Sequence, residues 1–433
     1  MSVAAPGGAP RVVVEPSDTV LHNHGDAAML QVALDRLRDE LPRARIEVFT
    51  EESERLSARC PTVVPLPIDA RRAATGGLDA LRRLLPAAPG GLRVLRPLAR
   101  WTSEAFPNAS RTLARWGLRV VGGGDPGAAH RRQLAGAHLL VVAGMGGLTD
   151  AFHSFAAGLL DSIEHALDAG VPVALMGQGI GPLADRGLRK RAARVLPRAA
   201  LIALREGRAS PRLLAELGVP AERIVVTGDD AISFAWAQCP VSLGDGLGVN
   251  VRIADYAGTA RRDVVGPVAT ALRTAAATAI APLVPLPIAC HGGDDDAETI
   301  RVMLGAATAE RVTSPDQVLD RVARCRVVVT GSYHAGVFAL AMGVPVVALV
   351  ASPYYHDKMR GLAHQFGADG CRVVALDDPD APTALVDAVA TQWADAERLR
   401  PALLAAAECQ AAAGRHAYGR LAGIGRRGAE AEA

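Results

Sequence analysis

The sequence predicts an α/β protein built from two Rossmann-like domains that face each other across a cleft. Three observations support this fold class. Short apolar runs alternate with amphipathic helical patterns along most of the chain, which is typical of parallel sheets covered by helices. The alternation forms two series, separated at residues 239–246 by a segment rich in Pro, Gly and Ser that is typical of a linker. With 433 residues, the chain is long enough for two or three domains.

The first domain is expected to occupy residues 1–240. Its apolar runs have the length of buried strands, and six of them suffice for one doubly wound sheet. Between them, residues 152–169 and 188–196 have the pattern of amphipathic helices. The expected strands are residues 12–14, 46–49, 139–142, 173–176, 201–204 and 224–227.

Residues 60–131 do not fit this alternation. They contain many Arg, several Pro and Gly, and two of the four Trp, Trp101 and Trp116. We expect a mostly helical insertion between strands of the first domain. It is either a lid over the cleft or a surface elaboration, and a surface elaboration would suit the contact of a homo-oligomer.

The second domain is expected to occupy residues 241–381, where the same alternation continues. Residues 265–279 and 294–307 have the pattern of its helices. The remaining residues, 382–433, are Ala-rich and helical in pattern, and this C-terminal helical segment can reach back across the first domain. The expected strands are residues 247–251, 283–288, 327–330, 346–350 and 373–376.

Composition argues against several kinds of partner. The 47 basic and 45 acidic residues leave a formal net charge of +2, so no overall field favours nucleic acid. No apolar run reaches membrane-spanning length and the N-terminus lacks the pattern of a signal peptide, so we expect a cytoplasmic protein without an integral membrane segment. The six Cys have no C-x-x-C pair and no His at zinc-ligand spacing, so no metal is expected. The excess of Arg over Lys and the abundant Ala are typical of a bacterial genome rich in GC.

The first candidate residues stand between the first strand and a helix, in "LHNHGDAAML". Ligands of open parallel sheets bind beyond the carboxyl ends of the strands, so polar residues at strand ends are candidates for a site. Here they are Asn23, Gly25 and Asp26, beside backbone N–H groups that can meet an anion or a substrate hydroxyl. Asp26 is either a catalytic acid or the N-cap of the helix.

Two strands of the first domain end in glycine-rich turns. These are "VVAGMGGLTD", with Gly144 and Gly146, and "LMGQGIGPL", with Gln178. Because glycine lets the backbone approach a ligand or adopt a positive φ, both segments are candidates for the wall of the cleft. Neither matches a dinucleotide-binding G-x-G-x-x-G closely or contains the G-K-[ST] of a P-loop, so tight turns are the competing explanation.

Two further strand ends carry titratable side chains. In "ALREGRAS", Arg205 follows a strand, and its planar guanidinium in the cleft would suit a carboxylate or a phosphate. In "IACHGGDDDAETI", His291 ends a strand and lies either in the cleft or on the surface. The three Asp that follow, at 294–296, are expected to cap the next helix, because carboxylates favour its positive end.

The stretch "VVVTGSYHAGVFALAMGVPVVAL" places a histidine between two buried strands. Gly331 and Ser332 form the turn after the first strand, Tyr333 follows, and His334 lies in the first turn of a helix. The positive end of a helix disfavours a protonated imidazole, which suits a group that accepts a proton. The competing explanation is a structural histidine, hydrogen-bonded at a domain surface.

The order of these motifs resembles the polysaccharide pyruvyl transferase family. The motifs are N-x-G-D near the start, a strand-end G-x-G-x-G, R-E-x-x-x-S with "LLAELG", "VTGDDA", "LGVNVR", and a strand, turn, His and helix ending in "GVPVVAL". They span the chain from Asn23 to about Gly367, apart from the insertion. The resemblance implies a fold similar to the two-domain GT-B glycosyltransferases. It also implies transfer of the enolpyruvyl unit of phosphoenolpyruvate to sugar hydroxyls as a ketal, in polysaccharide biosynthesis.

The resemblance further implies roles for four residues. Asp26 would contact or activate the acceptor, and His334 would be a general acid or base, or a contact of the phosphate. Arg205 and Lys358, the latter in "YYHDKM", would hold the carboxylate and phosphate of the donor. Cations and one acid/base pair suffice for this chemistry, so no cofactor is expected. The expected partners are a small anionic donor and a sugar-type acceptor.

One position departs from the family pattern. Many members carry R-L-H, whereas this chain has Ser332 and Tyr333 before His334. The two residues either supply neutral hydrogen bonds to the donor in place of the cation, or mark a subgroup with another donor. Two alternatives therefore stay open: a GT-B glycosyltransferase that uses a nucleotide sugar, and a non-catalytic sugar-binding protein of a glycan or natural-product cluster. The acceptor and the oligomeric state also stay open.

Overall fold

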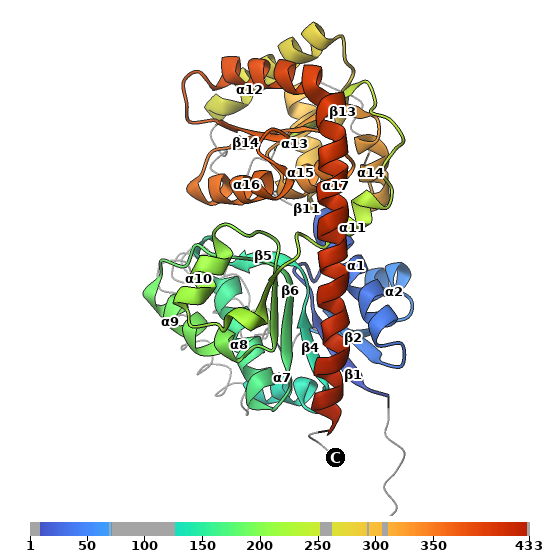
Figure 1. Cartoon of the computed structure of the whole chain (residues 1–433), viewed down its shortest axis with the longest axis vertical. Helices are drawn as coiled ribbons and strands as arrows, with labels where there is room; N and C mark the ends of the chain where they lie inside the picture. The colour runs from blue at the N-terminus through green and yellow to red at the C-terminus, as the bar shows by residue number, and fades with distance from the viewer. Residues whose placement is uncertain are drawn as a thin grey trace, which may run out of the picture.

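The computed structural model describes residues 9–68, 71, 126–251, 262–291, 294–304 and 311–430. Two parallel sheets lie one above the other, each covered by helices, and the long helix α17 runs beside both (Figure 1). This arrangement confirms the predicted α/β fold with two Rossmann-like domains. Most of the predicted insertion at residues 60–131, including Trp101 and Trp116, lies outside the described residues.

Within the described residues, the first sheet has eight parallel strands, in the order β3-β2-β1-β4-β6-β7-β8 with β5 paired to β6. The order reverses between β1 and β4, and such a switch point is where doubly wound sheets bind ligands. The strands are β1 Arg11–Glu15, β2 Arg45–Thr50, β3 Val64–Pro67, β4 Leu139–Val142, β5 Met145–Leu148, β6 Val173–Ile180, β7 Leu201–Leu204 and β8 Ile224–Val226. The helices around it are α1 His24–Glu40, α2 Ser53–Arg59, α7 Pro126–Leu134, α8 His153–Asp168, α9 Arg186–Val195, α10 Ser210–Glu216 and α11 Ala231–Trp236.

The prediction of six strands for this sheet misses β3 and β5. Strand β3 reads VPLP and lies partly exposed at the sheet edge, where proline is tolerated, so it shows no apolar run. Strand β5 reads MGGL, and its two glycines have the pattern of a turn. Since β3 lies within residues 60–131, the start of the predicted helical insertion is instead an edge strand of the sheet.

The second sheet, within the described residues, has five parallel strands in the order β10-β9-β13-β14-β15. Its order also reverses beside its first strand, β9, so its ligand-binding edge lies at the carboxyl ends of β9 and β13. The strands are β9 Gly246–Asn250, β10 Leu283–Pro285, β13 Cys325–Thr330, β14 Val346–Val350 and β15 Cys371–Ala375, and a small hairpin consists of β11 Cys290–His291 and β12 Asp294–Asp295. The helices are α12 Arg262–Ala279, α13 Asp296–Leu304, α14 Pro315–Val322, α15 Tyr333–Ala341 and α16 Pro353–Phe366.

The triple Asp does not act as one cap. Helix α13 begins at Asp296, and Asp295 accepts the N–H groups of Ala297 at 2.9 Å and Glu298 at 3.3 Å, as a cap does. Asp296 is buried instead, and its Oδ2 accepts hydrogen bonds from the Nδ2 of Asn250 and from the backbone N–H groups of residues 288 and 289, all at 2.9 Å. It therefore fixes the loop that follows β10.

The C-terminal segment forms helix α17 (Ala381–Glu430), which packs against both domains. A helix of 50 residues is about 75 Å long, enough to pass both sheets. Leu385 and Val389 join the apolar core of the second domain, whereas Tyr418 and Leu421 join that of the first. Because one continuous helix enters both cores, it restrains the position of one domain relative to the other.

Backbone hydrogen bonds also join the two domains at the start of α1. The N–H of His24 donates to the carbonyl of Ile288, and that of Cys290 donates to the carbonyl of His22, both at 2.9 Å. The start of α1 is therefore held against the loops of the second domain, and side chains of both domains meet there.

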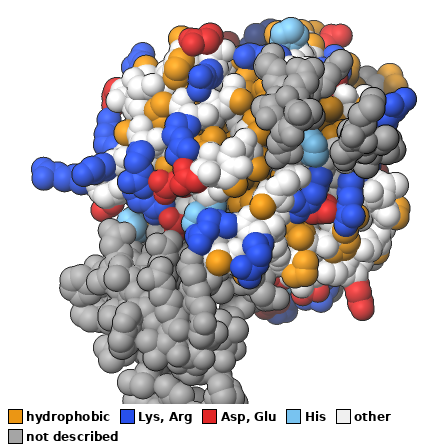
Figure 2. Space-filling view, turned by 90° about the horizontal axis from the view of Figure 1, so that it is seen from below, with side chains coloured by type: hydrophobic (Ala, Val, Ile, Leu, Met, Phe, Trp, Pro, Cys, Tyr) orange, Lys and Arg blue, Asp and Glu red, His pale blue; other side chains and the backbone are white. Residues whose placement is uncertain are grey.

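Figure 2 shows how side chains of different kinds are distributed on one face of the molecule. Basic, acidic and apolar side chains are interspersed on the described part of the first domain that Figure 2 shows from below. Among the described helices, none combines the length and the apolar character needed to cross a membrane.

Candidate active site

Two adjoining cavities lie in the cleft between the domains, with volumes of about 350 and 360 Å³. We name the first the Asp26 cavity, since Asp26 and His334 line it, and the second the Ser210 cavity, since Ser210 lines it. The two cavities meet at five residues that line both, Gly146, Arg205, Tyr333, Tyr354 and Lys358.

Asp26 lies in the first turn of α1, on the wall of the Asp26 cavity. Asn23 is the N-cap of this helix, because its Oδ1 accepts the N–H groups of Gly25 at 2.9 Å and of Asp26 at 3.2 Å. Burial raises the pKa of the Asp26 carboxyl to about 7, and the charge of Asp18 adds to this shift. Asp26 is thus not needed as a cap, and a carboxyl that titrates near neutrality can both release and take up a proton.

His334 lies in the first turn of α15 and is buried against the start of α1. A Cβ atom added to Gly25 would lie 2.0 Å from the Cγ atom of the His334 ring, so a glycine is needed there to make room for the imidazole. On its other side, the Nε2 of His334 lies 3.8 Å from the Oδ2 of Asp229. A histidine of the second domain therefore reaches into a polar recess of the first.

Arg205 follows β7 and is only 5% exposed. Its side chain passes beside two glycines: a Cβ atom on Gly146 would lie 2.3 Å from its Nη2, and one on Gly179 would lie 2.5 Å from its Nε. These glycines thus leave room for the guanidinium. This explains why glycine stands at the two positions, and it differs from both explanations that the sequence suggested, a tight turn or the approach of a ligand. Its Nη1 lies 3.7 Å from the Oδ2 of Asp229, which compensates the buried charge.

Tyr333 turns the face of its ring toward two cations of the cleft. The Cζ of Arg205 lies 4.3 Å, and the Nζ of Lys358 lies 4.9 Å, from the centre of this ring. The Nζ of Lys358 also lies 5.3 Å from the ring centres of Tyr354 and Tyr355. At such distances an aromatic face attracts a cation. The ring of Tyr333 thus positions two cations from elsewhere in the chain. The sequence analysis considered only the hydroxyl of Tyr333, as a hydrogen-bonding group, and did not predict this contact of its ring.

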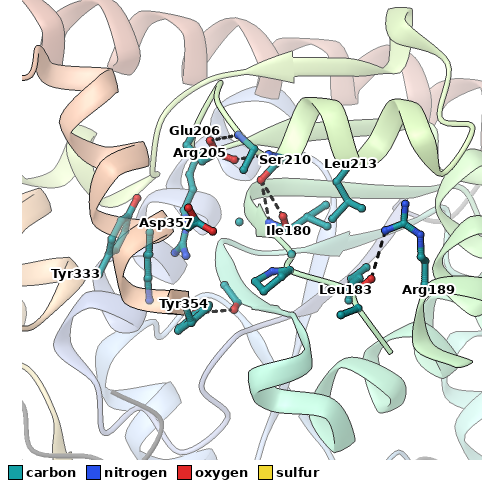
Figure 3. Close-up of a pocket in the computed structure, with 17 residues that line it drawn as sticks. Ile180, Leu183, Arg189, Arg205, Glu206, Ser210, Leu213, Tyr333, Tyr354 and Asp357 are labelled. Carbon is teal, nitrogen blue, oxygen red and sulfur yellow. Dashed lines mark hydrogen bonds between the residues drawn. The ribbon is translucent and has the colours of Figure 1, made fainter. Parts of the chain in front are cut away.

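Polar bonds shape the wall of the Ser210 cavity. Glu206 accepts the three successive backbone N–H groups of residues 208–210 at 2.6 to 2.8 Å and so caps α10. The Oγ of Ser210 donates to the carbonyl of Ile180 at 3.1 Å, which holds the end of β6. Figure 3 shows these residues on one side of the pocket and Tyr333, Tyr354 and Asp357 on the other. The cavity is therefore closed by both domains.

The motif "VTGDDA" supplies two buried carboxylates that the sequence analysis quoted without assigning them to the site. Asp229 lies between Arg205 and His334, as described above; burial raises its pKa, and the charge of Arg205 lowers it in part. Asp230 instead accepts a hydrogen bond from the hydroxyl of Tyr418 on α17 at 2.9 Å. Two adjacent Asp directly after a strand were the available signal, but their spacing alone did not say which one faces the cleft.

Tyr354 and Tyr355 were also not predicted, although both line the Asp26 cavity. The segment "YYHDKM" was singled out for its charged residues and not for its tyrosines. The hydroxyl of Tyr354 donates to the carbonyl of Gly146 at 3.2 Å, across the cleft. This bond ties α16 of the second domain to the glycine-rich turn of the first.

Four predicted residues that the structure describes in full line neither cavity: Gly25, Gly144, Gln178 and Gly331. Gly144 faces Met29, since an added Cβ atom would lie 2.7 Å from its Sδ. Gln178 is fully buried, and its Nε2 donates to the carbonyls of residues 143 and 176 at 2.8 Å, so it stabilises the sheet. His291 lies in the β11 hairpin, and the N–H of Gly331 donates to the carbonyl of Asn250 beside β9.

Among the described residues, no group of three or more His, Cys, Asp or Glu is placed to hold a metal ion. Within the described part of the chain, the charged groups that line the two cavities are instead three cations, Arg189, Arg205 and Lys358, and four carboxyls, Asp18, Asp26, Glu206 and Asp357. The imidazole of His334 and several hydroxyls accompany them. Such a set can bind an anion and move protons.

Comparison with known families gives one match that covers most of the chain. A family model described as polysaccharide pyruvyl transferase matches residues 23–353. No protein of curated function matches the chain.

Several solved structures have a similar fold. UDP-GlcNAc 2-epimerase from Methanocaldococcus jannaschii is 10% identical, with a TM-score of 0.53 over 89% of this chain and 92% of that one. UGT89C1 of Arabidopsis thaliana, complexed with quercetin, is 12% identical, with a TM-score of 0.52 over 92% and 94%. MnaA of S. aureus with UDP is 14% identical, with a TM-score of 0.51 over 94% of each chain. At these identities the similarity establishes the fold, which is that of the GT-B proteins.

Proposed function

The chain belongs to the polysaccharide pyruvyl transferase family, since the family model matches residues 23–353, and from this premise we propose that it transfers the pyruvyl group of phosphoenolpyruvate to hydroxyls of a sugar or glycoside. Family membership by itself makes the protein a transferase. The choice of donor and the roles of the residues are argued below from the cleft.

The observation that carries the proposal is the pair of cations on the ring of Tyr333. Arg205 and Lys358 lie 4.3 and 4.9 Å from its centre, at the point where the two cavities meet. Phosphoenolpyruvate carries two anionic groups on its central carbon, and two fixed cations of this kind suit its carboxylate and its phosphate. This chain lacks the arginine that many family members carry two residues before the histidine, but Arg205 and Lys358 still supply two cations to the cleft.

Proton transfer is the second requirement of the reaction. A hydroxyl must lose a proton as it attacks, and the methylene carbon of the donor must gain one. Asp26, with a pKa of about 7, is half-buried on the wall where an acceptor would enter and serves as the base. His334, held against Asp229 and Gly25, serves as the acid that protonates the donor.

The reaction balances with these groups alone. Two acceptor hydroxyls form two C–O bonds to the central carbon of the donor, whose bond to the phosphate oxygen breaks. One hydroxyl proton ends on the former methylene carbon and the other leaves with the phosphate. The developing positive charge at the central carbon is stabilised by the nearby carboxylates, and the departing phosphate by the cations.

A comparison of donors tests the proposal. Thermal unfolding is measured with phosphoenolpyruvate and, separately, with UDP-, GDP- and TDP-sugars, since a ligand of the native state raises the melting temperature. We expect a rise with phosphoenolpyruvate that Arg205→Ala reduces and that Arg212→Ala, at an exposed arginine on α10, leaves unchanged. A rise with a nucleotide sugar alone would identify a glycosyltransferase and refute the donor. No rise with any of these compounds would favour a sugar-binding protein.

A further inference from the structure

A third cavity, of about 530 Å³, lies at the junction where α1 meets the second domain. We name it the junction cavity. Its walls come from the loop before α1 and from α2 on one side, and from the segments around Pro287, Asp295 and Val312 on the other. Its lining shares no residue with the Asp26 or Ser210 cavity. Its volume falls in the range of about 300 to 1,000 Å³ that is usual for small-molecule sites.

Among the residues that the structure describes, the junction cavity is lined by three arginines, Arg55, Arg59 and Arg311, and by one acidic residue, Asp295. The Nη2 of Arg311 lies 3.7 Å from the Oδ2 of Asp295, but Arg311 is 83% exposed, so this pair is weak. Asp295 is also engaged in capping α13. The cavity therefore has an excess of positive charge, contributed by both domains.

Arg59 is held in an orientation that leaves part of its guanidinium unused. Its Nη2 donates to the carbonyl of Thr313 at 3.2 Å, which fixes the side chain across the junction. Its Nη1 is buried and has no hydrogen-bond partner among the described residues. Burial lowers the pKa of Arg59, and the charge of Arg55 contributes to this shift. A buried donor on a charged group is costly when it is left unsatisfied, and an anion would satisfy it.

His24 adds a neutral polar wall. It is buried, and its Nε2 lies 3.2 Å from both the carbonyl of Val312 and the Sγ of Cys290. Burial lowers the pKa of His24 to about 4, so at neutral pH it adds no charge. The positive charge of the site thus belongs to the arginines.

We propose that the junction cavity binds a small phosphorylated anion, with Arg55 and Arg59 of the first domain and Arg311 of the second as its ligands. Three guanidinium groups that line one cavity suit an anion with several charged oxygens better than a single carboxylate. Such a ligand would contact both domains beside the hydrogen bonds that join them. The site does not depend on which donor the cleft binds.

The test measures pyrophosphate binding by calorimetry to the full-length protein carrying Lys358→Glu. That substitution places a carboxylate among the residues of the Asp26 cavity and so weakens anion binding there. We expect pyrophosphate to bind this background, and adding Arg59→Ala or Arg55→Glu to raise its Kd at least tenfold. Acetate at the same concentration should not compete.

The matched control is Arg43→Glu, a charge reversal at an exposed arginine just beyond the far end of α1, which should leave the Kd unchanged. Arg55 is exposed, so its variant is expected to fold even if Arg59→Ala does not, and melting curves without ligand check both. Background binding that neither variant weakens, or no binding to the background at all, would overturn the site. Neither result bears on the proposed donor, because every variant compared carries the same Lys358→Glu substitution in the cleft.

Discussion

Gly179→Ala should disable the site, although the substitution changes no charged residue. Gly179 lies near the end of β6 and its φ is not positive, so alanine causes no backbone strain there. The added Cβ atom would instead lie 2.5 Å from the Nε of Arg205, 2.7 Å from its Nη2 and 2.8 Å from its Cζ. The whole guanidinium must therefore move.

The size of the effect follows from these distances. To reach ordinary contact at 3.4 Å, the Nε must move by about 0.9 Å, which displaces the guanidinium from Asp229 and from the ring of Tyr333. A misplacement of about 1 Å in a positioning group costs about 100-fold in rate, or about 2.7 kcal/mol of transition-state stabilisation. Overpacking costs about 1 to 3 kcal/mol in stability, so the variant should still fold.

The assay is release of phosphate from phosphoenolpyruvate in the presence of the acceptor, with kcat/KM as the readout. Gly266→Ala is the control, because a Cβ atom at this exposed helical glycine meets nothing within 4 Å. Its activity should equal that of the unaltered protein. If Gly179→Ala keeps kcat/KM within twofold of the control, the guanidinium of Arg205 does not act where the structure places it.

Three further outcomes are expected. Asp229→Asn should lower kcat more than tenfold and alter the pH profile of kcat, because it removes the carboxylate between Arg205 and His334; an unchanged profile would contradict this. Tyr333→Leu should raise the KM for phosphoenolpyruvate about tenfold, while Tyr333→Phe, which keeps the ring, should leave it unchanged. Asp230 has its pKa raised from 3.8 to about 7, so the unfolded chain loses this proton first and stability falls as pH rises through that window. Urea unfolding at pH 4.5 and 7.5 should show a smaller fall for Asp230→Asn, and an equal fall would refute the assignment.

The position of several site residues was predictable because it depends on local patterns. An apolar run followed by a turn and a helix marks a strand end wherever it occurs, and the carboxyl ends of parallel strands meet at one edge. This reasoning placed Asp26, Arg205 and His334 at the cleft, and the structure brings all three to the walls of the adjoining cavities. The same reasoning failed for Gln178, since it does not tell whether a side chain at a strand end points into the cleft or into the sheet.

The sequence by itself determined the fold class, the division of the strands into two successive sheets and the family, because periodicity, turn residues and motif order are local properties of the chain. Only the tertiary structure decided that Asp229 joins Arg205 to His334, and that the ring of Tyr333 lies against two cations. It also decided that Gly25 and Gly179 make room for other side chains. Each of these contacts joins separate elements of the fold, some within one domain and some between the two, so no local pattern records it and only the packing of those elements creates it.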